Sequence, residues 1–257
     1  MHVCAPNPLK PLLLSTDEET EAQGHQANRR RWQESVLEKA PRHCLGFNLL
    51  AGDREGEYTG YKNRELFDEL KEKYGCTICG TCSGNCPGCY AKKMTRFPDV
   101  LRHDVENTIA VIEDPKKAVE ELESVIFGNG KSPEFFRLHD SGDFYSYDYF
   151  YYVIKMIERH PETRFGAYTK EPEIVNRYGI ENLPENLSLQ CSPWPGYCEP
   201  IGNLPQFIYD NGTDPEIAKL PHCPAVNKEG HRTGVQCKDC LYCYTCKPGM
   251  KRAVYAH

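Results

Sequence analysis

The pattern of apolar and polar residues predicts helices that alternate with strands along most of the chain. Apolar side chains at helical spacing predict helices, and short apolar runs bounded by turn residues predict strands. The helices are expected at residues 30–38, 63–74, 115–127, 147–159 and 171–178. The strands are expected at residues 45–50, 135–139, 163–168, 187–190 and 207–210. This alternation is typical of βα units, so the sequence predicts an α/β fold built on a parallel sheet.

Polar residues follow three of the predicted strands, at the point where each strand ends. His139 opens a polar run that continues to Asp143, Lys170 follows the next strand, and Cys191 follows a third. In parallel sheets, ligands bind at the carboxyl ends of the strands. The sequence therefore predicts a site at this edge of the sheet.

The chain divides into three parts by composition. Residues 1–43 contain several prolines and an acidic run, and they are expected to form a peripheral segment. Residues 44–220 hold the predicted βα units, with a cysteine-rich loop at residues 76–90. Residues 221–257 form a second cysteine-rich region at the carboxyl end.

The overall composition argues against several classes of protein. The 257-residue chain is 39% hydrophobic and carries a net charge of -6. It has no run of the roughly 20 apolar residues that span a bilayer and no signal-peptide core, so a cytoplasmic protein is expected. Nucleic-acid binders usually carry a basic excess, which makes nucleic acid a disfavoured partner without excluding it.

The cysteines are the most unusual feature of the composition. There are 14 of them, and most fall in two clusters. The first cluster contains Cys76, Cys79, Cys82, Cys86 and Cys89, and the second contains Cys237, Cys240, Cys243 and Cys246, with Cys223 upstream. Bunched cysteines in a reducing compartment indicate metal ligands rather than disulfides, and thiolates suit both iron–sulfur clusters and zinc.

The spacing within the first cluster fits two kinds of iron–sulfur site. Its first four cysteines and the following proline have the C-x2-C-x2-C-x3-C-P spacing of bacterial ferredoxins. The run Cys82-x3-Cys86-x2-Cys89 instead resembles the three-cysteine signature of the radical S-adenosylmethionine enzymes. In those enzymes three cysteines bind three irons, and the fourth iron binds S-adenosylmethionine. If Cys79 is a further ligand, that fourth iron is closed to the cofactor.

The second cluster is compatible with an iron–sulfur cluster or with structural zinc. Its expected ligands are Cys223, Cys237, Cys240 and Cys243, and Cys246 is an extra candidate, as Cys76 is for the first cluster. Zinc ribbons usually separate their two cysteine pairs by a dozen or more residues. The continuous x2 spacing therefore favours a 4Fe–4S cluster, and the region resembles the auxiliary-cluster regions of many radical enzymes.

The likeness to radical enzymes extends to the end of the strand at 135–139. Those enzymes carry a Gly-Gly-Glu-like motif that meets the cofactor at the corresponding strand end. Ser141-Gly142-Asp143 stands in that place here, and these residues with Tyr90 are the expected cofactor-binding set. The resemblance implies a partial or distorted (β/α) barrel of the radical type, with cysteine-rich cluster loops.

The charged residues of the same strand are candidates for catalysis. Arg137 and His139 are expected on one side of the strand, at positions i and i+2, and with Asp143 they form the expected catalytic set. The alternative is that Arg137 and His139 form a salt bridge with Asp140 or Asp143. Charged groups are rarely buried without a partner, so both interpretations stay open.

Three segments of the chain resemble a phage protein family called "gene product eighty-eight". They are the segments CPGCYA at residues 86–91, FRLHDSGDF at 136–144 and FGAYTK at 165–170. Together with the late Cys-Pro and C-x2-C-x2-C, the likeness covers roughly residues 45–257. The resemblance implies a phage or mobile-element origin, a bacterial host cell and a distant kinship with radical enzymes. It implies no substrate.

Three functions follow from these features. The first is a radical S-adenosylmethionine-like enzyme with one catalytic-type and one auxiliary 4Fe–4S cluster, supplied by an electron donor such as ferredoxin or flavodoxin. The second is an iron–sulfur protein for electron transfer or redox sensing, with no enzymatic activity. The third is a zinc-binding nucleic-acid module, and the acidic charge balance counts against it.

Overall fold

The computed structural model of the chain describes residues 45–47, 98–193 and 198–255. All of them belong to one compact unit, residues 42–257. The expected peripheral segment at 1–43, the helices expected at 30–38 and 63–74, and the first cysteine cluster at 76–90 lie outside the described residues.

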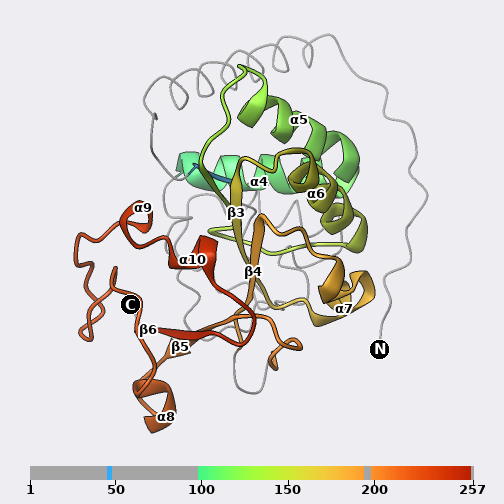
Figure 1. Cartoon of the computed structure of the whole chain (residues 1–257). Coiled ribbons are helices and arrows are strands. Elements are labelled where there is room, and N and C mark those ends of the chain that lie inside the picture. The colour runs from blue at the N-terminus through green and yellow to red at the C-terminus, as the bar shows by residue number, and fades with distance from the viewer. Residues whose placement is uncertain (1–44, 48–97, 194–197, 256–257) are drawn as a thin grey trace. The chain divides into compact units, whose positions relative to one another are not determined.

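A parallel sheet of six strands forms the centre of the described structure, with the strands in sequential order (Figure 1). The strands are β1 (Leu45–Phe47), β2 (Phe135–Leu138), β3 (Arg164–Thr169), β4 (Leu187–Cys191), β5 (Gln206–Asp210) and β6 (Lys251–Tyr255). Every neighbouring pair is parallel, which confirms the predicted parallel sheet. Among the described residues the sheet is open, because β1 and β6 are its two edges.

Helices connect most of the strands. They are α4 (Pro98–Glu113), α5 (Pro115–Phe127), α6 (Tyr147–Arg159), α7 (Pro172–Tyr178), α8 (Pro215–Ala218), α9 (Cys237–Cys240) and α10 (Tyr242–Thr245), with a 3-10 turn at Ile180–Asn182. The predicted helices at 115–127 and 147–159 are confirmed with the same bounds.

Side-chain caps explain why α5 and α6 begin where they do. The Asp114 carboxylate accepts a hydrogen bond from the Lys117 amide at 3.0 Å, and Pro115 occupies the first turn, where its missing N–H costs nothing. The Ser146 hydroxyl oxygen accepts a hydrogen bond from the Tyr149 amide at 3.2 Å. Each cap satisfies one of the backbone donors that a helix start leaves unpaired.

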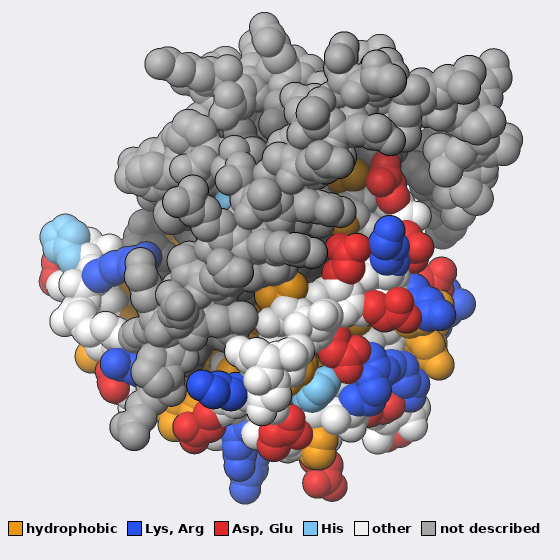
Figure 2. Space-filling view, turned by 90° about the horizontal axis from the view of Figure 1, so that it is seen from above, with side chains coloured by type: hydrophobic (Ala, Val, Ile, Leu, Met, Phe, Trp, Pro, Cys, Tyr) orange, Lys and Arg blue, Asp and Glu red, His pale blue; other side chains and the backbone are white. Residues whose placement is uncertain are grey.

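The sheet buries an apolar face against helices α4 to α7. Alternate residues of β2, β3 and β4 point to this side because successive side chains in a strand lie on opposite faces. The strand residues in this core are Phe136, Leu138, Phe165, Ala167, Leu189 and Cys191, and all are at most 2% exposed. They pack with α6, whose Phe150, Val153 and Ile154 are fully buried. Figure 2 shows acidic and basic side chains interspersed over the described surface in its view.

The opposite face of the sheet lies against the cysteine-rich carboxyl-terminal segment. Helix α10 packs on β3 and β4, on the side of the sheet away from α5 and α6 (Figure 1). Gly166 makes this approach possible, since a Cβ there would lie 3.0 Å from the Cys243 carbonyl oxygen and 3.0 Å from the Tyr244 ring. The sequence places a small residue where the two backbones meet.

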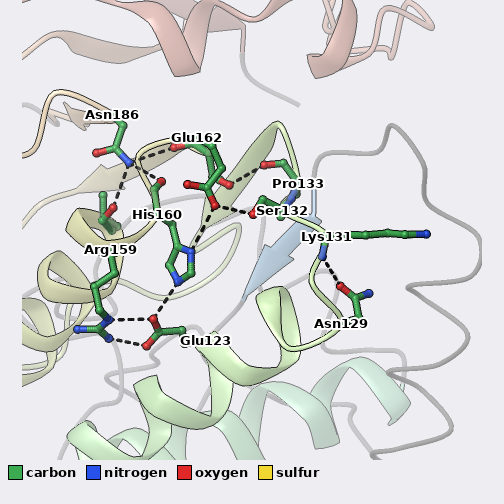
Figure 3. A network of polar contacts seen from close by, with 11 residues as sticks. Glu123, Asn129, Lys131, Ser132, Pro133, Arg159, His160, Glu162 and Asn186 are labelled. Carbon is green, nitrogen blue, oxygen red and sulfur yellow. Dashed lines mark hydrogen bonds and ion pairs between the residues drawn. The ribbon is translucent and has the colours of Figure 1, made fainter.

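A polar network ties the helices to the amino ends of the strands (Figure 3). Glu123 of α5 accepts hydrogen bonds from Arg159 and lies 2.8 Å from the His160 Nε2 atom. The Asn186 amide donates to the carbonyl oxygens of Ile157 and His160 at the end of α6, at 3.1 and 2.9 Å. These contacts satisfy backbone groups that the helix end would otherwise leave unpaired.

Some elements differ from the sequence prediction. The predicted strands are confirmed with ends that move by at most one residue, but β1 is described only at Leu45–Phe47. Helix α4 and strand β6 were not predicted. In α4 the buried positions Asp104, Thr108 and Val111 have helical spacing, but two of them are polar and obscure the apolar pattern. Strand β6 is a short element directly after the second cysteine cluster, and five residues give little periodicity to detect.

Candidate functional site

Four cysteines of the carboxyl-terminal segment line one pocket. They are Cys223, Cys237, Cys240 and Cys243, which are the four ligands expected from the spacing of the second cluster. The remaining wall includes Phe207 of β5, Val235 and Arg252 of β6. None of the seven cysteines in the described ranges forms a disulfide.

Two single-turn helices bring three of these cysteines together. Cys237 and Cys240 are the first and last residues of α9, and Cys243 lies in α10. Leu241 separates the two helices and has φ 53, a left-handed conformation that ends α9 and redirects the chain. The chain thus changes direction within the C-x2-C-x2-C run, and the thiols before and after the turn line the same pocket.

The fourth thiol comes from a segment fixed on the sheet. The Cys223 amide donates to the Ala253 carbonyl oxygen at 2.8 Å, and the Ala253 amide donates to the Pro221 carbonyl oxygen at 2.9 Å. This pairing holds Cys223 beside β6. The pocket therefore combines a loop anchored on one strand with two short helices, of which α10 packs on two other strands.

Hydrogen-bond donors approach two of the pocket sulfurs. The Tyr168 hydroxyl, from β3, donates to the Cys243 Sγ atom at 2.7 Å. The Arg252 Nη1 atom donates to the Cys240 Sγ atom at 3.2 Å, and its guanidinium lies 3.7 Å from the centre of the Tyr242 ring. Donors in these positions stabilise negative charge on sulfur.

Burial opposes that charge at Cys243. Burial raises the pKa of the Cys243 thiol to about 11, and the Tyr168 hydrogen bond and the Arg137 charge act in the opposite direction. Without a bound metal this thiol keeps its proton. A metal would have to displace the proton, and Tyr168 and Arg137 reduce the cost of that displacement.

Cys246 is separated from the four pocket thiols. Its Sγ atom lies 2.7 Å from the Ser188 hydroxyl oxygen of β4, and it is absent from the pocket lining. Burial raises the pKa of the Cys246 thiol, while the Ser188 contact opposes the rise. Four of the five cysteines expected at the second site therefore line one pocket, and the fifth contacts β4 instead.

The pocket thiols line a hollow but do not converge on one point. In the described part of the chain, no group of three or more Cys, His, Asp or Glu side chains is placed to hold a metal ion. The first-cluster candidates and the expected cofactor residue before α4 lie outside the described residues; they are Cys76, Cys79, Cys82, Cys86, Cys89 and Tyr90.

Asp143 ties two strand ends together at the carboxyl edge of the sheet. Its Oδ1 atom accepts from the Phe144 amide and its Oδ2 atom from the Lys170 amide, each at 2.7 Å. Asp143 is 4% exposed, and burial raises its pKa to about 6 against the opposing effect of the Lys170 charge. The expected cofactor-binding carboxylate is thus engaged with backbone amides after β2 and β3.

The Ser141 hydroxyl beside Asp143 is also buried. Ser141 is 8% exposed, and its Oγ atom has no hydrogen-bond partner among the described residues. Gly142 follows with φ 80, which glycine adopts without strain. A buried hydroxyl in this state indicates a place for a water molecule or a ligand atom.

Arg137 and His139 do not share one face of β2, so that prediction is wrong. Strand β2 ends at Leu138, and His139 has φ 59, which turns its side chain toward the helix side of the sheet. There its Nε2 atom lies 2.8 Å from the Tyr149 hydroxyl, and burial lowers its pKa to about 3. His139 is therefore neutral at ordinary pH.

Arg137 faces the cysteine-rich side instead. Its Nε atom lies 2.6 Å from the Asp140 Oδ1 atom, and its guanidinium lies 4.9 Å from the centre of the Tyr168 ring. The salt-bridge alternative is confirmed for Arg137 and Asp140. The positive charge of Arg137 acts to lower the pKa of the Cys243 thiol, so the strand-end motif interacts electrostatically with the cysteine pocket.

Asp104 of α4 is a buried acid that the sequence analysis did not single out. It is 4% exposed, and burial raises its pKa to about 7, with the nearby Asp140 carboxylate adding to the rise. The signal in the sequence was an acid at helical spacing from Thr108 and Val111 on the inner face of an overlooked helix.

Comparisons with known proteins place the chain in one family. The model of the family described as "Gene product 88" matches residues 50–193, which is more than half of the chain. The match includes the first cysteine cluster and the strand-end motif, and it ends before the cysteine pocket. No curated protein and no solved structure matches the chain. No helix in the described ranges is long and apolar enough to span a bilayer.

Proposed function

Since the chain belongs to the gene product 88 family of phage proteins, we propose that it is a phage iron–sulfur protein with a 4Fe–4S cluster in the cysteine pocket. We also assign a catalytic-type 4Fe–4S cluster to the cysteine-rich loop at residues 76–90. With these two 4Fe–4S clusters the chain would act as a radical S-adenosylmethionine-like enzyme, to which we assign no substrate.

The main support for the proposal is that only four of the five cysteines expected at the second site line the pocket. Cys223, Cys237, Cys240 and Cys243 line one hollow, while Cys246 contacts Ser188. Four thiolates are the usual ligand set of a 4Fe–4S cluster. A cuboidal cluster takes its four thiolates on four separate iron atoms, so its ligands surround a hollow rather than meet at one ion.

The surroundings of the pocket fit an anionic group. A cluster with four thiolates carries net negative charge, and the Arg252 guanidinium and the Tyr168 hydroxyl both donate to ligand sulfurs. Such hydrogen bonds stabilise the reduced state and raise the reduction potential. When bound, the cluster would supply one-electron transfer. The residues of the chain would hold its sulfurs and set its charge balance, and Phe207 and Val235 would form part of the surrounding wall.

The enzymatic part of the proposal rests on the arrangement of the sheet. A sequential strand order with the long helices on one face is the arrangement of βα barrels, whereas doubly wound sheets reverse their order and carry helices on both faces. A partial barrel of the radical type agrees with this order. The buried Ser141 hydroxyl at the carboxyl edge supports a ligand at the place where such enzymes meet their cofactor.

A non-enzymatic electron carrier or redox sensor is the second candidate, and Asp143 favours it. Both carboxylate oxygens of Asp143 already accept backbone amide hydrogens, so they are committed to joining two strand ends. A carboxylate used in this way is a poor partner for the amino group of S-adenosylmethionine. In either case an electron donor such as ferredoxin or flavodoxin is the partner that the cluster requires.

The experiment is an anaerobic preparation of the full chain in which iron, acid-labile sulfide and zinc are counted. Iron and sulfide in equal amounts, at about four or eight of each per chain, are the expected result. Zinc without sulfide would overturn the cluster proposal and leave a structural zinc site.

Electron paramagnetic resonance of the reduced protein then separates the two iron–sulfur candidates. A cluster signal that changes when S-adenosylmethionine is added supports the radical enzyme, because the change requires an open iron. A signal that is unaffected by the cofactor contradicts the enzyme and leaves the electron carrier or sensor.

A further inference from the structure

Two further thiols lie together at the carboxyl end of β4, away from the cysteine pocket. Cys191 is the last residue of β4 and fully buried, and Cys198 is 7% exposed. Both Sγ atoms approach the Glu199 carbonyl oxygen, Cys191 at 3.7 Å and Cys198 at 3.3 Å. The two sulfurs therefore approach the same carbonyl group, and each thiol shifts the pKa of the other. Neither is used by the proposed cluster site.

Charged groups from the neighbouring strand ends surround this pair. The groups that act on Cys191 are the Cys198 thiol, the Ile201 amide, the Lys170 side chain and the Asp143 carboxylate. The hydrogen bond from Cys198 lowers the pKa of Cys191, the Ile201 amide and the Lys170 charge lower it further, and burial opposes the effect. The same contact and burial raise the pKa of Cys198.

The pair thus consists of two unlike thiols. The pKa of Cys191 is lowered, because a donor and a cation stabilise its thiolate form, whereas the pKa of Cys198 is raised. Oxidation of a cysteine depends on its thiolate character and on access of the oxidant, and a second thiol nearby can resolve the first oxidation product. Cys191 has the lowered pKa, and its sulfur shares the Glu199 carbonyl contact with the sulfur of Cys198, so this pair offers both an oxidisable thiol and a resolving thiol.

We propose that Cys191 and Cys198 form a redox site that hydrogen peroxide converts into an intrachain disulfide. The Cys191 thiolate attacks one peroxide oxygen, the O–O bond breaks, and Cys191 becomes a sulfenic acid as the other oxygen leaves as hydroxide, which takes up the proton lost by the Cys191 thiol and becomes water. The Cys198 sulfur then attacks the Cys191 sulfur, the S–S bond forms, and the S–O bond breaks to release a second water. In total, two thiols lose two electrons and two protons, and one peroxide becomes two waters.

The burial of the pair selects a small oxidant. The nucleophilic sulfur is fully buried and its partner is 7% exposed, so a protein disulfide cannot reach either sulfur in the folded chain. Hydrogen peroxide is about the size of two water molecules and requires no large opening. The site lies at the same sheet edge as Asp143 and Lys170, so its oxidation would change the carboxyl edge of the sheet.

The sequence provides a direct measurement of this disulfide. Trypsin cuts after Arg177 and Lys219, so Cys191 and Cys198 are the two cysteines of one tryptic peptide, residues 178–219. The full chain, as purified anaerobically, is treated with hydrogen peroxide in the presence of an iron chelator, alkylated, digested and analysed by mass spectrometry. The expected peptide 178–219 is two hydrogens lighter and carries no alkyl group. Dithiothreitol before alkylation restores two alkylation sites.

Variants test the roles within the pair. Cys198→Ser should trap the sulfenic acid on Cys191, which a dimedone probe detects, and Cys191→Ser should abolish both products. Lys170→Met should slow disulfide formation at pH 7 and shift the rate profile to higher pH, which a merely structural role would not do. Cys246→Ser is the matched control and should oxidise like the unmodified chain.

The wild-type peptide decides the proposal even if a variant fails to fold. Separate alkylation of both cysteines after peroxide treatment would overturn it. So would a disulfide between Cys191 and a cysteine outside residues 178–219. Because the readout counts thiols in one peptide, it does not depend on whether the cysteine pocket holds a cluster.

Discussion

The two faces of the same sheet differ sharply although their residues alternate along the same strands. Phe165 faces the helices and is fully buried, and the adjacent Gly166 faces the cysteine-rich segment, where it meets the Cys243 carbonyl oxygen. The helix face is filled by large apolar side chains. The opposite face presents Arg137, Tyr168 and Ser188, each of which reaches the cysteine-rich segment by charge or by a hydrogen bond.

This difference shows how one sheet separates stability from chemistry. Apolar burial is non-directional and tolerates any well-packed arrangement, so it suits the side that holds the fold together. Polar side chains with fixed partners suit the side that positions sulfur atoms. We therefore expect substitutions on the helix face to change the free energy of unfolding, and substitutions on the cysteine face to change metal content and potential.

Phe165→Ala should give the largest effect. The ring is fully buried and lies 6.0 Å from the Phe136 ring and 6.5 Å from the Phe127 ring. Its removal should lower the free energy of unfolding by about 3–5 kcal/mol, through lost burial and the cavity left behind. Urea unfolding followed by circular dichroism measures the change.

Phe135→Ala is the matched control for that prediction. Phe135 belongs to the same sheet but is half-buried and packs on Tyr244, at 5.1 Å between ring centres. Its removal should cost about half as much stability as Phe165→Ala. Equal costs would contradict the distinction between the two faces.

Gly166→Ala should act mainly on the cysteine side. The new Cβ would lie 3.0 Å from the Cys243 carbonyl oxygen, so α10 must move away from the sheet. Overpacking of this kind costs about 1–3 kcal/mol, and the movement of α10 displaces Cys243 relative to the other pocket thiols. Iron per chain, measured after anaerobic purification, should fall by more than the loss of folded protein explains. Full iron content in this variant would show that α10 does not need its close contact with β3.

Glu123→Gln tests the polar network beside the helix layer. Hydrogen bonds from Arg159, together with that from His160, lower the pKa of Glu123, so its folded pKa lies below the ordinary 4.5. A lowered carboxyl pKa stabilises the fold above the unfolded pKa, and this contribution is lost as pH falls through the folded value. The side chain is 20% exposed, so the cost should be about 1 kcal/mol at pH 7.

Unfolding in urea at several pH values checks this prediction. The difference between the variant and the unmodified chain should shrink toward zero below about pH 4. Glu158→Gln is the control, because its pair with Lys155 is exposed and should contribute little at any pH. A pH-independent difference for Glu123→Gln would mean that packing rather than charge explains its cost.

Tyr168→Phe should give the smallest effect. It removes the hydroxyl that donates to the Cys243 Sγ atom and keeps the ring against Phe207, at 5.0 Å between centres. One hydrogen bond to sulfur is worth about 1 kcal/mol, which corresponds to about 40 mV in a one-electron couple. Redox titration should show a lower potential with unchanged iron content. An unchanged potential would mean that Tyr168 does not act on the cluster.

The sequence predicted the helix face of the fold well. Helices α5 and α6 were expected with their observed bounds, because an apolar stripe at helical spacing lies between clear signals such as Pro115 and Arg159. The four pocket cysteines were also expected; three of them have x2 spacing, a local property that short helices such as α9 preserve, and the fourth, Cys223, lies upstream in the same region.

The rest depended on features that a local pattern does not contain. The positive φ of His139 reverses the side of the sheet that its side chain faces, and an alternating strand pattern gives no sign of that turn. The separation of Cys246 from its neighbours requires Ser188, a residue 58 positions away. The pairing of Cys191 with Cys198 likewise depends on a carbonyl group and on charges from neighbouring strands.

Iron content of two single-cysteine variants tests the central claim most directly. Cys240→Ser removes a thiol that lines the pocket, and Cys246→Ser removes one that contacts Ser188. Both changes replace the same atom in the same short segment, so folding affects them alike. Cys240→Ser should lose about four irons per chain, and Cys246→Ser should keep the full content. Equal iron in the two variants, or a loss confined to Cys246→Ser, would contradict this claim.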